Sequence, residues 1–517
     1  MRKETSRAIQ GTWILTIASL LSELLSAIYR IPLQNIVGDR GYFIYQQVYP
    51  IYGIFSVLAL SGLPVVISKV FAQQGSDAAK SRLMKNTFGL LLAVCILITI
   101  LLWGASKKLA FFMGDPNLYH EVRAVSLTFL LIPFEASLRG YFQSELIMEP
   151  SAISQISEQL VRIIVIIGAA MLFGKGMLDE YQMGTLANSG AFIGGLFAVV
   201  ILGIAMLVRH PLVKSKQSSD LKLEKGLSLE VVLIIIFTGV TIFYQFIDSF
   251  SMLRLLMRAG HQLAEAEILK GVFDRAQPLI QLGIVISLSF VSTIMPQLKS
   301  DKFDMNKQLI GKMMRVCLWL ATAETAGLIS LMPVVNTMLF TNSDGSFALG
   351  VYMLSIVIVS GINLLIAVTS SDNEKNLVKL VIFLVSLVAK VVLNILLIPH
   401  FGIVGAALAT VLSELIILSG LLMIYSKDRG TLLIGRRFTV KVLSSGLFMA
   451  LCIRALEKFM NHYLFLTRVN SVLISIVLIP IGIVIYLYLS KVLNILDKSE
   501  WKILPMGKLF IKIMRIE

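Results

Sequence analysis

Residues 86–105, NTFGLLLAVCILITILLWGA, contain no charged side chain. A helix of this length rises about 30 Å, which matches the hydrocarbon core of a bilayer. Lipid offers no partners to backbone N–H and C=O groups, so such a stretch must be helical. The sequence therefore predicts an all-α polytopic membrane protein of about fourteen transmembrane helices, with spans at 9–34, 43–70, 86–105, 121–144, 152–174, 185–208, 229–256, 271–297, 309–334, 347–370, 377–398, 402–425, 437–456 and 470–490.

The composition also indicates a membrane protein. Of the 517 residues, 56% are hydrophobic and 15% are charged, whereas soluble domains are about 25% charged. The net charge of +15 lies in short loops and forms no basic domain, so we expect no nucleic-acid partner. Lys and Arg are concentrated in the loops on the side of the two termini, which predicts that both termini are cytoplasmic.

One polar stretch suggests how the chain is divided. Residues 209–228 form the longest polar segment, and they follow the sixth predicted helix. We expect an N-lobe at 1–215, a C-lobe at 216–430, and two further helices with a basic cytoplasmic tail at 431–517. Two lobes of six helices are a common transporter plan, with the substrate site between them near the midplane of the membrane.

Ionisable residues inside the apolar blocks are the clearest functional signal. Each costs about 2.5–3.5 kcal/mol at the centre of a helix, so each should face a partner or a cavity. The candidates are Glu23, Arg30, Glu135, Arg139, Glu158, Arg162, Asp248, Arg254, Asp274, Arg275, Glu324, Lys390 and Glu414.

Two of these acids precede an arginine by four residues, which is the favourable order for a pair within one helix. They are Glu135 with Arg139 and Glu158 with Arg162. A cavity lined by arginines would bind an anion, because guanidinium is always charged and forms bidentate bonds with phosphate oxygens. The arginines therefore favour a diphosphate over a hydrophobic cation as the cargo.

These residues also have structural interpretations. Arginines near helix ends can extend to lipid headgroups, and the spaced pairs can simply neutralise a helix surface. Glu324 and Glu414 are single acids near block edges and are interpreted as structural. The aromatic residues at the start of the second helix are interpreted as an interfacial belt; they are Tyr42, Phe43, Tyr45, Tyr49 and Tyr52.

The sequence lacks the common short motifs of ATPases and zinc enzymes. The sequence has no GxxxxGK[ST] loop, no HExxH motif, and no Cys or His set at zinc spacing. A membrane glycosyltransferase would need an acidic metal-binding loop or a sizeable domain outside the membrane. We therefore expect a transporter and no enzyme, with no cofactor and no metal.

Four segments resemble a known family. LSAIYRIPLQNIVG (25–38), SGLPVVISKVFAQQG (61–75), LRGYFQSELIMEPSAISQISEQLVRI (138–163) and LVAKVVLNILLIPHFGIVGAALATVLSELI (387–416) are similar to segments of bacterial stage V sporulation protein B and related polysaccharide-biosynthesis transporters. These are related to the MurJ-type lipid II flippases, in the superfamily that includes the multidrug and toxin extrusion proteins. The resemblance extends in order over most of residues 8–425.

The resemblance implies two six-helix lobes in a V-shaped arrangement in the bacterial cytoplasmic membrane. It implies alternating access that moves a lipid-linked saccharide, lipid II first, from the inner to the outer leaflet. Helices thirteen and fourteen would then form a groove for the lipid tail. Arg30 matches the family's diphosphate-binding position best, with Arg162, Arg275 and Arg139 as further anion contacts and Glu158 holding Arg162. The family's arginine on helix two has no match, because residues 42–63 contain no Arg or Lys.

Alternatives within and outside this class stay open. The cargo could be another lipid-linked repeat unit, of teichoic acid, capsule or spore cortex. The chain could also be a cation-coupled drug antiporter, or a membrane scaffold that transports nothing. The expected partners are the lipid-linked saccharide, membrane lipids and cell-wall synthases, and the chain is expected to be a monomer.

The resemblance also suggests a coupling site. Some flippase relatives bind sodium in the C-lobe, and the matching positions are Asp248, Lys390, Asn394 and Thr410. A lysine is incompatible with a simple sodium site beside it. We therefore expect Lys390 to act as a tethered cation that pairs with Asp248, with transport driven by the membrane potential or by protons.

Overall fold

The computed structural model describes residues 2–72, 77–209, 233, 236–237, 239–298, 303–369, 375–426, 434–504, 507 and 511–512. Within these ranges the regular structure is helical, without a β-strand. Eleven helices are long and apolar enough to cross a membrane. One of them contains both predicted spans between 377 and 425, and helical segments also cover the spans predicted at 121–144 and 271–297. The predicted all-α membrane fold is therefore confirmed.

The chain forms two compact units, Met1–Gly271 and Val272–Glu517. Residues 210–228, which make up most of the predicted linker, lie outside the described residues, as does much of the basic tail. The lobe boundaries at 215 and 430 stay a prediction.

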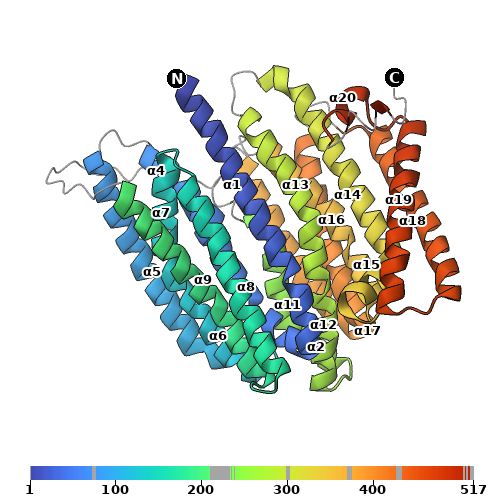
Figure 1. Ribbon diagram of the computed structural model, residues 1–517, viewed down its shortest axis with the longest axis horizontal. Helices are drawn as coiled ribbons and strands as arrows, with labels where there is room; N and C mark the ends of the chain where they lie inside the picture. The colour runs from blue at the N-terminus through green and yellow to red at the C-terminus, as the bar shows by residue number, and fades with distance from the viewer. Residues whose placement is uncertain are drawn as a thin grey trace. The chain divides into compact units, whose positions relative to one another are not determined.

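The first unit is built from long helices with several breaks (Figure 1). Its elements are α1 (Arg2–Ile28), α2 (Arg30–Gln47), α3 (Tyr49–Ser56), η1 (Val57–Gly62), α4 (Leu63–Ala72), α5 (Asp77–Phe112), η2 (Pro116–Leu118), α6 (Tyr119–Ser126), η3 (Leu127–Leu131), α7 (Ile132–Ser144), α8 (Glu149–Gly174), α9 (Glu180–Arg209), α11 (Val240–Arg258) and most of α12 (Leu263–Asp274).

The tightest helix pair of this unit is α8 with α9, and two glycines of α9 allow their backbones to meet. A Cβ atom at Gly194 would lie 2.6 Å from the carbonyl oxygen of Glu158, and one at Gly190 would lie 3.1 Å from that of Arg162. Small residues four apart are a common helix-packing device in membranes. The GAFIG segment at 190–194 therefore fixes the turn of α8 that carries Glu158 and Arg162.

Three breaks shape the helices around this pair. The helix continues from α1 through Tyr29, which keeps helical φ and ψ angles, until Gly38 (φ +71°) turns the chain into the second predicted span. The turn η1 is a π-helix, which is rare and is frequent at functional sites. The 3₁₀ turn η3 leads into α7, which has Pro133 in its first turn.

The second unit follows the same principles. Its helices are α13 (Ala276–Leu298), α14 (Phe303–Phe340), α15 (Ser346–Tyr352), α16 (Leu354–Thr369), α17 (Asn376–Ser426), α18 (Arg436–Tyr463), α19 (Arg468–Val492) and α20 (Lys498–Trp501). Within α17 the chain reverses at Gly402, whose φ of +55° favours glycine. The turn is tight, since a Cβ atom at Gly405 would lie 2.3 Å from the carbonyl oxygen of Leu397.

The last two long helices pack on α14. The indole of Trp319 on α14 donates to Ser490 Oγ of α19 (2.8 Å), and Tyr486 Oη donates back to the carbonyl oxygen of Trp319 (2.9 Å). Trp501 of α20 meets Trp319 edge to face at 5.5 Å. Arg315 of α14 forms an ion pair with the buried Glu500. These contacts tie α19 and α20 to the rest of the second unit.

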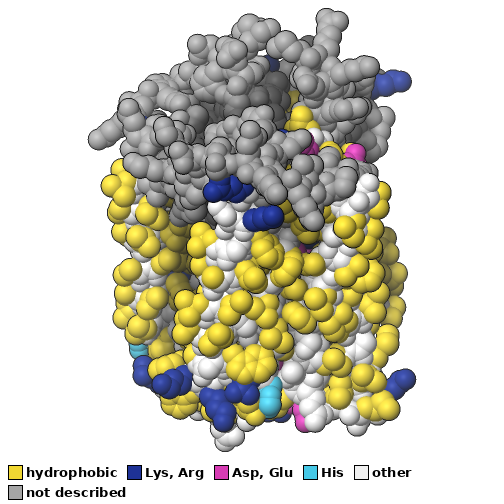
Figure 2. Space-filling model, turned by 90° about the vertical axis from the view of Figure 1, so that its left-hand side faces the viewer, with side chains coloured by type: hydrophobic (Ala, Val, Ile, Leu, Met, Phe, Trp, Pro, Cys, Tyr) yellow, Lys and Arg dark blue, Asp and Glu magenta, His cyan; other side chains and the backbone are white. Residues whose placement is uncertain are grey.

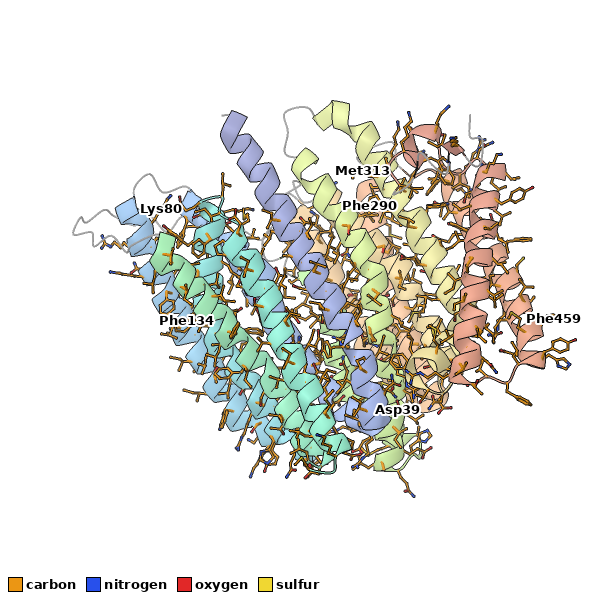
Figure 3. The ribbon with its side chains drawn as sticks, viewed as in Figure 1. Asp39, Lys80, Phe134, Phe290, Met313 and Phe459 are labelled. Atoms are coloured by element: carbon orange, nitrogen blue, oxygen red, sulfur yellow. The ribbon has the colours of Figure 1, made fainter. Side chains whose placement is uncertain are left out.

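The outer surface is apolar where lipid would contact it. Figure 2 shows hydrophobic side chains over the middle of one face, with Lys, Arg and His side chains along one edge. On α5, Leu90, Leu97 and Ile100 are among the exposed apolar residues. Lys80 and Asp39 mark opposite ends of the first unit's helices (Figure 3). This pattern is that of a multi-pass membrane protein.

The α8–α9 contact yields a paired stability prediction. Gly194→Ala should lower the free energy of unfolding by about 1–3 kcal/mol, because the added methyl group overlaps the carbonyl oxygen of Glu158. On the same helix Gly203 has no atom within 4 Å of the position of a Cβ, so Gly203→Ala should raise stability by about 0.5–1 kcal/mol. Thermal unfolding of the two detergent-purified variants measures both shifts. Equal shifts would contradict the assigned packing.

Candidate functional site

The polar face of α8 is the centre of the candidate site. Helix α8 begins at Glu149 with Pro150 in its first turn, where a proline costs no hydrogen bond. Ser154, Glu158 and Arg162 recur every four residues and therefore lie along one face. All three are at most 2% exposed, because this face packs inside the first unit and not against lipid.

Arg162 lies in a cage of tyrosines. Its Nη2 donates to Tyr45 Oη (2.9 Å) and Tyr29 Oη (3.2 Å), and these two hydroxyls lie 2.6 Å apart. Its guanidinium carbon is 3.7 Å from the centre of the Tyr52 ring. Aromatic faces attract a cation, and the attraction grows when water is excluded.

Arg30 shares this cage. It is the first residue of α2, directly after Tyr29, and is 2% exposed. Its guanidinium carbon lies 4.3 Å from the centre of the Tyr49 ring, and that of Arg162 lies 5.6 Å from the same centre. The Tyr49 ring of α3 therefore lies beside one arginine from α2 and one from α8.

The pair carries two positive charges without a carboxylate. Among the described residues, neither Arg30 nor Arg162 forms an ion pair with an acid. Arg30 Nε, Arg30 Nη2 and Arg162 Nη1 are buried without a hydrogen-bond partner. Buried donors that lack an acceptor are costly, and buried charges more so. The arrangement is suited to an anion with several oxygen acceptors. We call Arg30, Arg162, Tyr29, Tyr45, Tyr49 and Tyr52 the arginine–tyrosine site.

Arg139 has a different environment. Its Nη1 donates to Glu135 Oε2 (2.6 Å) and its Nη2 donates to Glu158 Oε2 (2.9 Å). Nε reaches Ser154 Oγ (3.2 Å), and Nη1 also reaches the carbonyl oxygen of Ala59 in η1 (3.3 Å). The predicted Glu135–Arg139 pair is therefore present.

The predicted pairing of Glu158 with Arg162 is wrong. Glu158 bonds to Arg139 on the neighbouring helix α7, and Arg162 bonds to tyrosine hydroxyls. The spacing of four residues between Glu158 and Arg162 allows a pair within α8, but it does not exclude a partner for Glu158 on another helix. A guanidinium from a facing helix can approach a carboxylate end-on, so the contact between α7 and α8 decided the pairing.

The interpretation of the second-helix aromatics as an interfacial belt is also wrong. Tyr45, Tyr49 and Tyr52 are at most 9% exposed and surround the two arginines. Their spacing of four and three residues places them on one helix face, which is the signal that would have identified them. Tyr29, the residue before α2, completes the set.

The other predicted residues lie apart from this site in the chain. In the second unit Arg275 Nη1 donates to Asn342 Oδ1 (2.7 Å) and Asn336 Oδ1 (3.0 Å). Lys390 Nζ donates to Thr410 Oγ1 (2.7 Å), and Asn394 is buried one turn further along α17. Asp248 is buried on α11, in the first unit.

Similar proteins place the chain in a family. The family model described as polysaccharide biosynthesis protein matches residues 8–300. In Bacillus subtilis (strain 168), the uncharacterized membrane protein YabM is 34% identical over 98% of this chain and 96% of its own length. Lipid II flippase MurJ of the same organism is 24% identical over 97% of this chain and 98% of its own.

The fold has a solved counterpart. A structure of lipid II flippase MurJ in an inward closed conformation superposes with a TM-score of 0.64, at 14% identity, over 92% of this chain and 98% of that one. The predicted family resemblance is thus confirmed, and with it the transporter fold. The chain belongs to the polysaccharide biosynthesis protein family of multi-pass membrane proteins.

Proposed function

We propose that this protein is a flippase that moves an undecaprenyl-diphosphate-linked cell-wall precursor, lipid II first, from the inner to the outer leaflet by alternating access. The observation that carries the proposal is the arginine–tyrosine site, in which Arg30 and Arg162 share a buried ring without a carboxylate. The full-length similarity to a protein named lipid II flippase supports it.

A diphosphate diester suits this site chemically. It carries two negative charges, which would balance the two guanidiniums, and its oxygens would accept from the three partnerless nitrogens. Tyr29 and Tyr45 add hydroxyls within reach of Arg162. A hydrophobic cation would instead need exposed carboxylates, and both acids near the site, Glu135 and Glu158, already bind Arg139.

Of the four arginines predicted to contact the anion, two already have other partners. Arg139 directs its donors to two carboxylates, a serine and a carbonyl oxygen, and Arg275 donates to two asparagines. We therefore assign the diphosphate to Arg30 and Arg162. Arg139 does not contact the diphosphate in this assignment; it holds Glu158, which lies one turn from Arg162 on α8. The two last helices, α18 and α19, would hold the lipid tail.

A second cargo class shares the same chemistry. Repeat units of teichoic acid, capsule or spore cortex can also be carried on a lipid-linked phosphate. The arginine–tyrosine site would bind the phosphate and does not distinguish these saccharides. Membrane lipids and cell-wall synthases are the proposed partners of a monomer whose two termini are cytoplasmic.

Removing a site arginine should stop transport without unfolding the protein. Arg30→Ala and Arg162→Ala should each reduce flipping in vesicles by about 10-fold or more, because each deletes charge-assisted bonds to the diphosphate. Flipping is measured as protection of labelled lipid II from an external reagent. Arg436→Ala, at the exposed start of α18, is the matched control. Normal flipping by Arg30→Ala would remove the assigned site.

Complementation identifies the saccharide. Expression in a strain depleted of its lipid II flippase should restore growth, and the Arg30→Ala variant should not. Rescue only of a strain that lacks a teichoic-acid or capsule exporter would assign the second cargo class. Raised resistance to cationic dyes on overexpression would instead favour a drug antiporter.

The coupling proposal makes a separate prediction. Lys390 donates to Thr410, and we propose that it replaces a sodium ion and pairs with Asp248 during transport. Flipping by the purified protein should therefore be the same in sodium and potassium buffers, and should respond to the membrane potential. Stimulation by sodium that is abolished in Asp248→Asn would contradict this role.

A further inference from the structure

A second buried cluster lies one turn of α8 away from Arg162 of the arginine–tyrosine site. Glu135 and Arg139 come from α7 and Glu158 from α8, and their side chains are at most 2% exposed. One guanidinium thus serves two carboxylates. We call these three residues the Glu–Arg–Glu cluster.

The charges of this cluster do not balance. With both acids ionised it carries one net negative charge in a water-excluded interior, where an uncompensated charge is costly. Two carboxylates that share a site cannot both ionise easily. The contacts around the cluster include Gly194 and Gly195 of α9, Ser154 and Gln159 of α8, the Tyr52 hydroxyl of α3 and the carbonyl oxygen of Ala59 in η1. Arg162, one turn along α8 from Glu158, donates to the tyrosine hydroxyls.

Two carboxylate oxygens of the cluster have no partner. Glu135 Oε1 and Glu158 Oε1 are buried without a hydrogen bond, although the other oxygen of each acid binds Arg139. The absence of a side chain at Gly195 leaves room for the first of them, since a Cβ atom there would lie 2.8 Å from Glu135 Oε1. A proton on either oxygen would make the cluster neutral.

We infer that Glu135 and Glu158 together bind one exchangeable proton, and that this proton controls the affinity of the arginine–tyrosine site for its anion. The first half stands on the geometry of the cluster alone. The second half rests on the proposed function. The ligand of the new site is a proton taken from water, carried on Oε1 of either acid.

Helix α8 provides the link between the two sites. Glu158 and Arg162 are one turn apart on it, and Tyr52 adjoins both: its ring stacks on Arg162 and its hydroxyl accepts from Gln159 Nε2 (3.3 Å). When the proton is bound, the cluster is neutral and the charge of Arg162 is available to the anion. When the proton leaves, a negative charge appears one turn away and competes for Arg162. Proton binding and anion binding therefore favour each other.

Infrared spectroscopy of the purified full-length protein tests the proton directly. A protonated carboxyl has a carbonyl band that a carboxylate lacks. The wild type at neutral pH should show this band, and it should disappear as the pH is raised. Because the proton is shared, Glu135→Gln and Glu158→Gln should each remove the same band: the remaining acid then pairs with Arg139 as a neutral couple. Glu145→Gln, whose acid binds Lys80 at a helix end, should leave the band unchanged.

The outcomes of this measurement are distinct. Loss of the band in both single variants supports the shared proton. Loss in only one variant would assign the proton to a single acid, and loss in neither would overturn the site. The spectrum of the wild type needs no substitution: a wild type without this band at neutral pH would overturn the site even if a variant failed to fold.

The linkage is tested by binding of a farnesyl-diphospho-N-acetylglucosamine, a diester whose own charge is constant around neutral pH. Its affinity for the wild type should fall by about 5-fold or more as the pH rises through the loss of the band. In Glu158→Gln the affinity should not depend on pH. If the affinity of the wild type did not change with pH while the infrared band disappeared, the linkage would be overturned. Absence of binding at every pH would refute the proposed function and leave the proton site standing.

Discussion

The burial of guanidinium groups is the constraint on which the first unit depends. Arg30, Arg139 and Arg162 are each at most 2% exposed. A cation of this kind cannot lose its proton, so the protein must surround it with acceptors, aromatic faces or opposite charge. Two solutions lie side by side: carboxylates around Arg139, and tyrosines around Arg30 and Arg162. The first places two carboxylates on one guanidinium, and the second leaves two guanidiniums without a carboxylate.

The backbone is organised to make these contacts. The glycines of α9 let α8 approach closely at the turn of Glu158 and Arg162. Arg30 of α2 lies against the ring of Tyr49 of α3, and the π-helical turn η1 presents the carbonyl oxygen of Ala59 to Arg139. Irregular backbone is tolerated inside a membrane protein only where other groups satisfy it. Here the π-helical turn lies beside the buried charge of Arg139.

Hydropathy and charge were enough to predict the helices and the buried arginines, because both follow from the cost of placing polar groups in lipid. They could not assign partners. Glu158 has an arginine four residues away on its own helix and another on α7, and only the packing of α7 on α8 selects Arg139. The role of Tyr52 was missed for a similar reason: an amphipathic ring suits a lipid interface as well as a buried cation.

The π-helical turn between α3 and α4 has a geometric consequence of its own. Such a turn holds one residue more than an α-helical path requires, and each α-helical residue advances the helix by about 100°. The one extra residue in Val57–Gly62 therefore sets the rotation of α3 about its axis, and with it the direction in which Tyr49 and Tyr52 point. Deleting one residue there would keep the span long enough to cross the membrane, yet it would turn both rings away from their arginines.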